Sequence, residues 1–182
     1  MKKISLLIVM SIVLFACQNA STEAEKPAEE TAAAAEPKST VEMPYTASYS
    51  SNFTTDVSDK DLKMVLDSYK YWETGDMKSL AAVMGDSVVY DNSSGVEKTY
   101  SNAELMKMWQ ASRDSLSNIK IDVVAYHKMK SDKGHQFIVV WYNETDSYKI
   151  GKVDSTERHD INAVDSTGRI VRYSQYTKPK TK

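Results

Sequence analysis

The spacing of hydrophobic positions divides the chain into three stretches. An apolar run of about a dozen residues comes first, which is a length typical of a secretion leader. A polar stretch rich in alanine, glutamate, serine and threonine follows, and from residue 53 onward apolar residues recur with a regular period. Residues 53–180 have the length of one ordinary domain. The pattern therefore predicts a single folded domain behind a leader and a tether.

Apolar residues in the first half of this domain recur three or four positions apart, which predicts helices with one apolar face. Ser58 is a suitable N-cap for the first helix, and Gly75 is a suitable stop. The segment Ser101–Glu104 has the residues of a capping box and opens the third helix. The predicted helices span 58–73, 77–84 and 101–115.

The period changes to two after the third helix. Ile119, Ile121 and Val123 alternate with mostly polar residues, and Ser131–Gly134 and Asp165–Gly168 are turn sequences. Helices followed by a long antiparallel meander indicate an α+β fold with the helices on one face of the sheet. The predicted strands span 87–91, 96–100, 119–129, 135–145, 148–164 and 169–176.

The first sixteen residues have the form of a signal peptide. Lys2 and Lys3 precede the apolar run, which is shorter than the roughly 20 residues that a membrane-spanning helix needs. The junction Leu14–Cys17 resembles the lipobox of bacterial lipoproteins, in which the cysteine takes a diacylglycerol and a peptidase cuts just before it. The resemblance implies a signal peptide at 1–16, acylation of Cys17 and a cell-envelope protein anchored to a membrane, the outer one where the cell has one. An ordinary signal peptide with a chance cysteine is the alternative.

Residues 17–52 are predicted to form the acylated cysteine and a flexible tether. Large apolar residues are almost absent from 18–52, so the segment cannot bury enough surface to offset the entropy of ordering. Cleavage before Cys17 removes two lysines and no acids, which changes the formal net charge from −2 to −4. A chain with this charge has no general attraction for nucleic acid. Three scattered histidines, one cysteine and the lack of a glycine-rich phosphate loop predict neither a metal site nor a cofactor.

Three local patterns resemble the nuclear transport factor 2-like superfamily, which includes ketosteroid isomerases, SnoaL-like polyketide cyclases, dehydratases and binding domains. They are Trp72–Asp76 between the first two helices, Asp86–Asp91 in the next strand, and the hairpin at 159–171. The resemblance covers residues 58–177. It implies a cone-shaped, curved and mostly antiparallel sheet with the three helices packed on its concave face. The open end of such a cone forms a pocket.

The same resemblance suggests catalytic positions. Asp91 falls where ketosteroid isomerases carry a general base, and Asp160 falls near their protonated, hydrogen-bond-donating acid. The tyrosine of the first helix does not match, because Ser68 occupies that position and Tyr69 lies one residue later. The constellation is therefore incomplete. The alternatives are that Asp91 caps a turn and that Asp160 pairs with a nearby basic residue.

His127 shares strand parity with Ile119 and Val123, so it is expected to face the interior of the cone. There it can move protons together with Asp160 or Asp91. A buried, hydrogen-bonded histidine is the alternative. Five aromatic residues are predicted to line the pocket, with plain core packing as their alternative: Tyr69, Trp72, Tyr90, Trp109 and Trp141.

These observations lead to three hypotheses for the function. The first is a tethered envelope domain that binds a small apolar ligand or a protein partner. The second is a proton-transfer enzyme of the isomerase, cyclase or dehydratase type, using Asp91 and Asp160 or His127. The third is a structural lipoprotein whose pocket is filled by its own side chains. Because the strand 135–145 is apolar on both faces, we also expect a homodimer formed through the convex face of the sheet.

Overall fold

The computed structural model describes residues 41–92 and 94–179. The predicted signal peptide at 1–16 and the predicted lipidation site Cys17 lie outside the described residues, as does most of the predicted tether. Among the residues that are described, no helix combines the length and the apolarity needed to cross a membrane.

Three helices form where the sequence predicts them: α1 (Asp59–Thr74), α2 (Met77–Val83) and α3 (Asn102–Asp114). The Ser58 side chain accepts a hydrogen bond from the Asp61 amide and so fixes the start of α1. Gly75 ends the helix in the left-handed conformation, with a φ of 78°, which favours glycine. The capping box of Ser101 and Glu104 is formed at the start of α3. Local capping thus sets the helix ends.

The strands form one seven-stranded sheet in the order β1-β4-β5-β6-β7-β2-β3. All neighbouring strands are antiparallel except β2 and β7, which are parallel. The strands are β1 (Phe53–Thr54), β2 (Met84–Asn92), β3 (Glu97–Ser101), β4 (Leu116–Ser131), β5 (Gln136–Tyr148), β6 (Val153–Val164) and β7 (Ile170–Pro179).

The sheet differs from the sequence prediction in the bounds of several strands and in one additional strand. The strand predicted from residue 148 begins only at Val153, because a tight turn with Gly151 at a φ of 84° joins β5 to β6. The two-residue strand β1 was not predicted, since it is too short to show a period. It pairs with the end of β4, where the Asp132 amide also donates to the Asn52 carbonyl over 3.1 Å.

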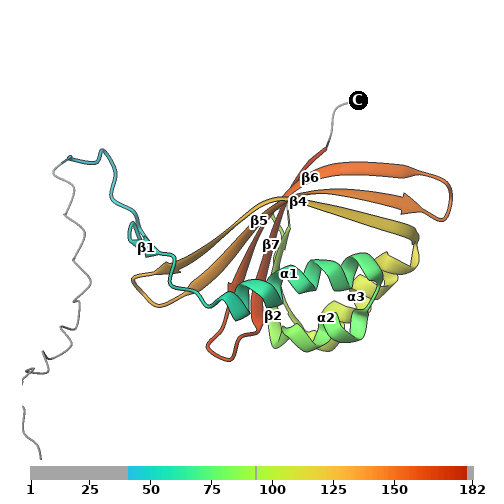
Figure 1. Cartoon of the computed structure of the whole chain (residues 1–182), viewed down its shortest axis with the longest axis horizontal. Coiled ribbons are helices and arrows are strands. Elements are labelled where there is room, and N and C mark those ends of the chain that lie inside the picture. Colours follow the sequence, from blue (N-terminus) through green and yellow to red (C-terminus); the bar gives the residue numbers. More distant parts are fainter. Residues whose placement is uncertain (1–40, 93, 180–182) are drawn as a thin grey trace, which may run out of the picture. The chain divides into compact units, whose positions relative to one another are not determined.

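The helices cover one face of the curved sheet (Figure 1), so the predicted α+β architecture with helices on the concave face is confirmed. Alternate residues of β5 point toward the helices and are buried there, as the period of two requires. The core between helices and sheet contains apolar side chains from both layers, including Val65, Leu80, Val88, Leu105, Ile138, Val140 and Ile170. A cavity lies between the helices and this face of the sheet.

Candidate functional site

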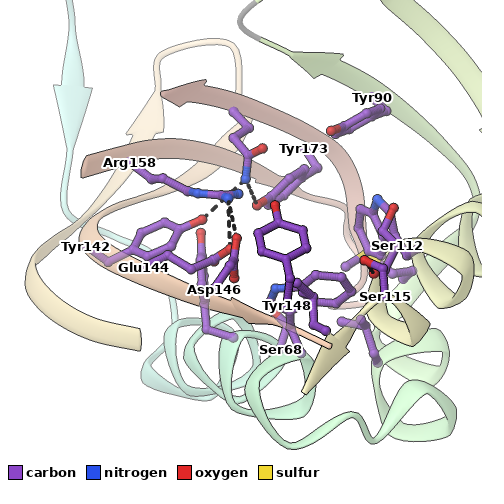
Figure 2. Close-up of a pocket in the computed structure, with 17 residues that line it drawn as sticks. Ser68, Tyr90, Ser112, Ser115, Tyr142, Glu144, Asp146, Tyr148, Arg158 and Tyr173 are labelled. Atoms are coloured by element: carbon purple, nitrogen blue, oxygen red, sulfur yellow. Dashed lines mark hydrogen bonds and ion pairs between the residues drawn. The ribbon is translucent and has the colours of Figure 1, made fainter. Parts of the chain in front are cut away.

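A cavity of about 350 Å³ lies between the three helices and strands β2, β5, β6 and β7. This volume is within the range of natural small-molecule sites, roughly 300–1,000 Å³. Figure 2 shows that the charged side chains gather on one side of it, while Ser112 of α3 and Ser115, the C-cap of that helix, lie on the opposite side. Seven aromatic side chains contribute to the lining: Tyr69, Trp72, Tyr90, Trp109, Tyr142, Tyr148 and Tyr173.

Two carboxyl groups and one guanidinium form the charged side of the cavity (Figure 2). Glu144 and Asp146 point inward from β5, and Arg158 points inward from β6. Arg158 Nη2 lies 2.8 Å from Glu144 Oε1 and 3.5 Å from Asp146 Oδ2. The arginine therefore pairs closely with Glu144 and only loosely with Asp146.

Burial dominates the electrostatics of this cluster. Glu144 is only 2% exposed, and burial raises the pKa of its carboxyl to about 8, although the neighbouring Arg158 opposes the rise. Burial also raises the pKa of Asp146, again against the effect of Arg158. A carboxyl group with a pKa near neutrality is suited to exchange protons at physiological pH. The pair thus combines a proton-active acid with a second carboxylate beside it.

One carboxylate oxygen of Asp146 makes no hydrogen bond with the described residues. This atom, Oδ1, is buried, and the residue is 9% exposed. A buried carboxylate oxygen without a donor is costly, so such an atom in a cavity marks a place where a ligand can bind.

Asp160 lies behind the cavity wall and holds three of the lining tyrosines. Its Oδ2 accepts hydrogen bonds from the hydroxyls of Tyr69 at 3.0 Å, Tyr142 at 2.8 Å and Tyr173 at 2.6 Å. Burial raises the pKa of Asp160 to about 6, while the three hydroxyls and Arg158 favour its ionised form. The carboxylate thereby fixes the orientation of the three tyrosine hydroxyls.

Two amides complete this network. Gln175 Nε2 donates to Tyr173 Oη at 2.9 Å and to Tyr142 Oη at 3.4 Å, and Asn162 Nδ2 donates to Tyr69 Oη at 3.0 Å. Each tyrosine hydroxyl thus both donates and accepts. The wall around Asp160 is a nearly satisfied polar network, in which Asp160 Oδ1 and Asn162 Oδ1 lack partners among the described residues.

The structure separates the three predicted catalytic residues. Asp160 is fully buried behind the tyrosines, whereas Asp91 lies on β2 opposite Glu97 of β3 and does not line the cavity. The turn after β2 is capped by Asn92, whose Oδ1 accepts from the Ser94 amide at 3.0 Å, and not by Asp91. Asp91 therefore occupies neither the cavity nor the turn-capping position proposed as its alternative.

The tyrosine of helix α1 reaches the predicted acid in spite of its offset. Tyr69 contacts Asp160, while Ser68, at the position expected for the tyrosine, donates to the Val65 carbonyl at 2.6 Å. The predicted alternative for Asp160, an ion pair with a basic neighbour, is replaced by hydrogen bonds from tyrosines. The contact between Tyr69 and Asp160 joins positions 91 residues apart, so local sequence gives no sign of it.

The expectation that His127 faces the interior is wrong. The register of β4 against β5 shifts between Val123 and Ala125, so Val124 is an extra residue in β4. One extra residue moves every later side chain to the opposite face. His127 consequently pairs with Val139 on the outer face, where it is exposed, and Lys128 reaches Asp59 of α1 on the inner one.

Four of the five predicted pocket aromatics, Tyr69, Trp72, Tyr90 and Trp109, line the cavity. The fifth, Trp141, lies on the outer face of β5, where it stacks on His159 with ring centroids 5.0 Å apart. The prediction missed Glu144, Asp146 and Arg158. The sequence held one sign of the two acids. Every second residue of β5 is buried, and this spacing leads from Tyr142 to Glu144 and Asp146. The predicted strand ended at residue 145, one short of Asp146.

No sequence model of a protein family matches this chain, and no curated protein sequence matches it.

Among the described residues, no group of three or more histidine, cysteine or acidic side chains is arranged to hold a metal ion.

Solved structures do resemble it. A ketosteroid isomerase from Mycobacterium sp. aligns with a TM-score of 0.54 at 17% identity, over 64% of this chain and 92% of its own. An LEH-like epoxide hydrolase from M. tuberculosis aligns with a TM-score of 0.56 at 12% identity, over 66% and 84%. An NTF-2 like protein of unknown function from Burkholderia xenovorans gives 0.51 at 13% identity, over 68% and 87%. Identities this low bear on the fold alone, and together with the helices packed on a curved sheet they show that this chain has the nuclear transport factor 2-like fold.

Proposed function

We propose that the domain binds a small ligand with an apolar ring in the cavity between its helices and sheet. The observation that carries this proposal is an open cavity of about 350 Å³ walled by aromatic side chains, with an unpartnered carboxylate oxygen at Asp146. Apolar walls with a few polar groups are typical of small-molecule sites. The aromatic side chains leave the cavity open, which disfavours the structural alternative in which they fill it.

Narrowing the cavity is expected to abolish ligand binding. Ser112 lines the cavity from α3, so Ser112→Trp places an indole in the ligand volume. The protein purified from its own host should carry a small molecule that native mass spectrometry detects, and the variant should lose it. Ala111→Trp is the matched control, because Ala111 is exposed on the same helix and does not line the cavity. Equal occupancy of Ser112→Trp and wild type would contradict binding at this site.

A proton-transfer enzyme is the second candidate, favoured by one observation. Burial raises the pKa of Glu144 to about 8 in a cavity that also holds Asp146. In this version Glu144 replaces the predicted Asp91 and His127 as the proton-active group, with Asp160 as a positioning residue. Deuterium uptake next to the carbonyl of a cyclic enone in heavy water tests it. Wild type should catalyse the exchange and Glu144→Gln should not.

We also propose that the domain is held on a membrane of the cell envelope through lipid on Cys17, as the Leu14–Cys17 junction suggests. Cys17→Ser is expected to remove all incorporation of labelled fatty acid and to leave residues 1–16 attached, because the thioether that precedes cleavage cannot form. Metabolic labelling and intact mass of the protein measure both effects. Labelling of the Cys17→Ser protein at the wild-type level would refute the anchor.

The convex face of the sheet is our proposed homodimer interface. Trp141, His159 and Tyr176 stack across β5, β6 and β7 there, and Trp141 and Tyr176 are 38% and 47% exposed. Aromatic residues in an exposed patch favour association. We expect sedimentation velocity at tens of micromolar protein to give a dimer, and Trp141→Glu to give a monomer. A wild-type monomer under these conditions would exclude this interface.

A further inference from the structure

Six hydroxyl groups that line the cavity already donate hydrogen bonds within the protein. The three tyrosine hydroxyls that contact Asp160 give their protons to its Oδ2. The three lining serines donate to backbone carbonyls, namely Ser68 to Val65, Ser112 to Met108 and Ser115 to Ser112. None of these six hydroxyls is left to donate to Asp146.

The two nearby arginines do not fill this gap. Arg158 Nη2 lies 2.8 Å from Glu144 but 3.5 Å from Asp146, and that longer contact is to Oδ2, not to Oδ1. Arg113 is close enough to act on Asp146 by charge, but its Nη1 and Nη2 donate to the carbonyls of Leu116 and Glu73, and its Nε is buried without a partner among the described residues. Asp146 also shares a hydrogen bond with the carboxyl group of Glu144, but its Oδ1 stays buried without a partner among the described residues. A ligand that donates a hydrogen bond to this oxygen would satisfy it, and a positively charged donor would form the strongest such bond.

The remaining walls suit a cation as well. Trp72, Tyr90, Trp109 and Tyr173 form a cluster of rings along the cavity, with Trp109 and Tyr173 centroids 5.6 Å apart and Trp72 and Trp109 centroids 6.5 Å apart. The π faces of tryptophan and tyrosine attract cations, and they also hold apolar rings. Carboxylates on one side and aromatic faces on the other are the two groups that recognise an organic ammonium ion.

We propose that the ligand of this cavity is a protonated amine on an apolar ring, whose ammonium group donates to Asp146 Oδ1 while its ring packs against the aromatic cluster. The inference rests on the proposed binding function and adds the charge of the ligand to it. An anionic ligand is disfavoured at this position, because its negative charge would meet the carboxylate oxygen Asp146 Oδ1 with no hydrogen-bond donor between them.

Three probes of one shape test the charge. They are 1-adamantylamine, 1-adamantanol and 1-adamantanecarboxylate, titrated by calorimetry at pH 7 into the full-length protein in nanodiscs, with empty nanodiscs as the blank. We expect the amine to bind at least about tenfold more tightly than the alcohol, since one charge-assisted hydrogen bond supplies such a factor. The carboxylate should bind more weakly than the alcohol.

One substitution assigns the preference to its residue. Asp146→Asn is expected to reduce the amine-over-alcohol preference to within about threefold, while an unchanged circular dichroism spectrum and unfolding transition report an intact fold. Asp122→Asn is the control, because Asp122 is an exposed acid of β4 outside the cavity. It should keep the full preference.

The outcomes separate the two proposals. An alcohol that binds as tightly as the amine, or an Asp146→Asn protein that keeps the preference, would overturn the amine assignment and leave ligand binding intact. Failure of all three probes would also overturn the amine assignment. Ligand binding itself would then be judged by the co-purification experiment on Ser112→Trp.

Discussion

The Arg158→Met variant is expected to have a free energy of unfolding about 3–5 kcal/mol below that of wild type at neutral pH. The reason is that Arg158 is the guanidinium in contact with two buried carboxyl groups, Glu144 and Asp146. Without it both acids remain in a low-dielectric site with no guanidinium in contact with them. Methionine is chosen because it keeps the length of the side chain. Chemical denaturation monitored by circular dichroism measures the loss.

The defect should depend on pH with a definite sign. The pKa of Glu144 in the folded protein, about 8, lies above its ordinary value of 4.5. Its contribution to stability is therefore fully present below about pH 4.5 and is lost as pH rises through 8. Arg158 favours the ionised form, so removing it should steepen this loss. We expect the defect to be smaller at pH 5 than at pH 8, and Glu144→Gln to restore part of the stability.

A surface arginine provides the control for this series. Arg169 pairs with Asp86, which is 89% exposed, so Arg169→Met should cost only about 0–1 kcal/mol. If Arg158→Met proved as mild as Arg169→Met, or if its defect grew toward acid pH, the account of a buried charge cluster would be wrong.

The Asp160→Ala variant is expected to lose about 3 kcal/mol or more of stability, because three buried tyrosine hydroxyls lose their acceptor and each unsatisfied group costs about 1–3 kcal/mol. Asp160→Asn should cost less than half as much, since an amide oxygen still accepts from the tyrosines. The two variants therefore separate loss of the acceptor from loss of the charge. Thermal and chemical unfolding of both measure the difference.

The pH dependence identifies the titrating group. The pKa of Asp160 is raised to about 6 from an ordinary 3.8, so wild type should lose stability as pH rises across that interval. Both variants should lack this component. Glu157→Ala is the control on the same strand, because Glu157 is 53% exposed and should change stability little. Equal costs for the alanine and asparagine variants would show that loss of the charge, and not loss of the acceptor for the tyrosine hydroxyls, sets the cost.

The helices and most of the strands could be predicted from the sequence, because the interactions that set their positions are between residues close together in the chain. Ser58 and Gly75 cap α1, and the Ser101–Glu104 box opens α3, so each helix end is set within a few residues. The alternation in β4 and the run of β-branched and aromatic residues in β5 likewise need no distant partner to be recognised. The order of these elements, together with three short family-like patterns, was enough to predict the fold.

The composition of the cavity depended on contacts that no local pattern encodes. The extra residue Val124 turned His127 to the outer face, and nothing in the alternation before it announces the shift. Asp160 meets Tyr69, Tyr142 and Tyr173 from three other elements, and Arg158 meets Glu144 across the β5–β6 pair. Sequence by itself determined which segments are helix, strand and turn, because capping and periodicity act between near neighbours. Only the tertiary structure decided which side chains share the cavity, because strand register, bulges and the packing of helices on the sheet are set by contacts between distant residues.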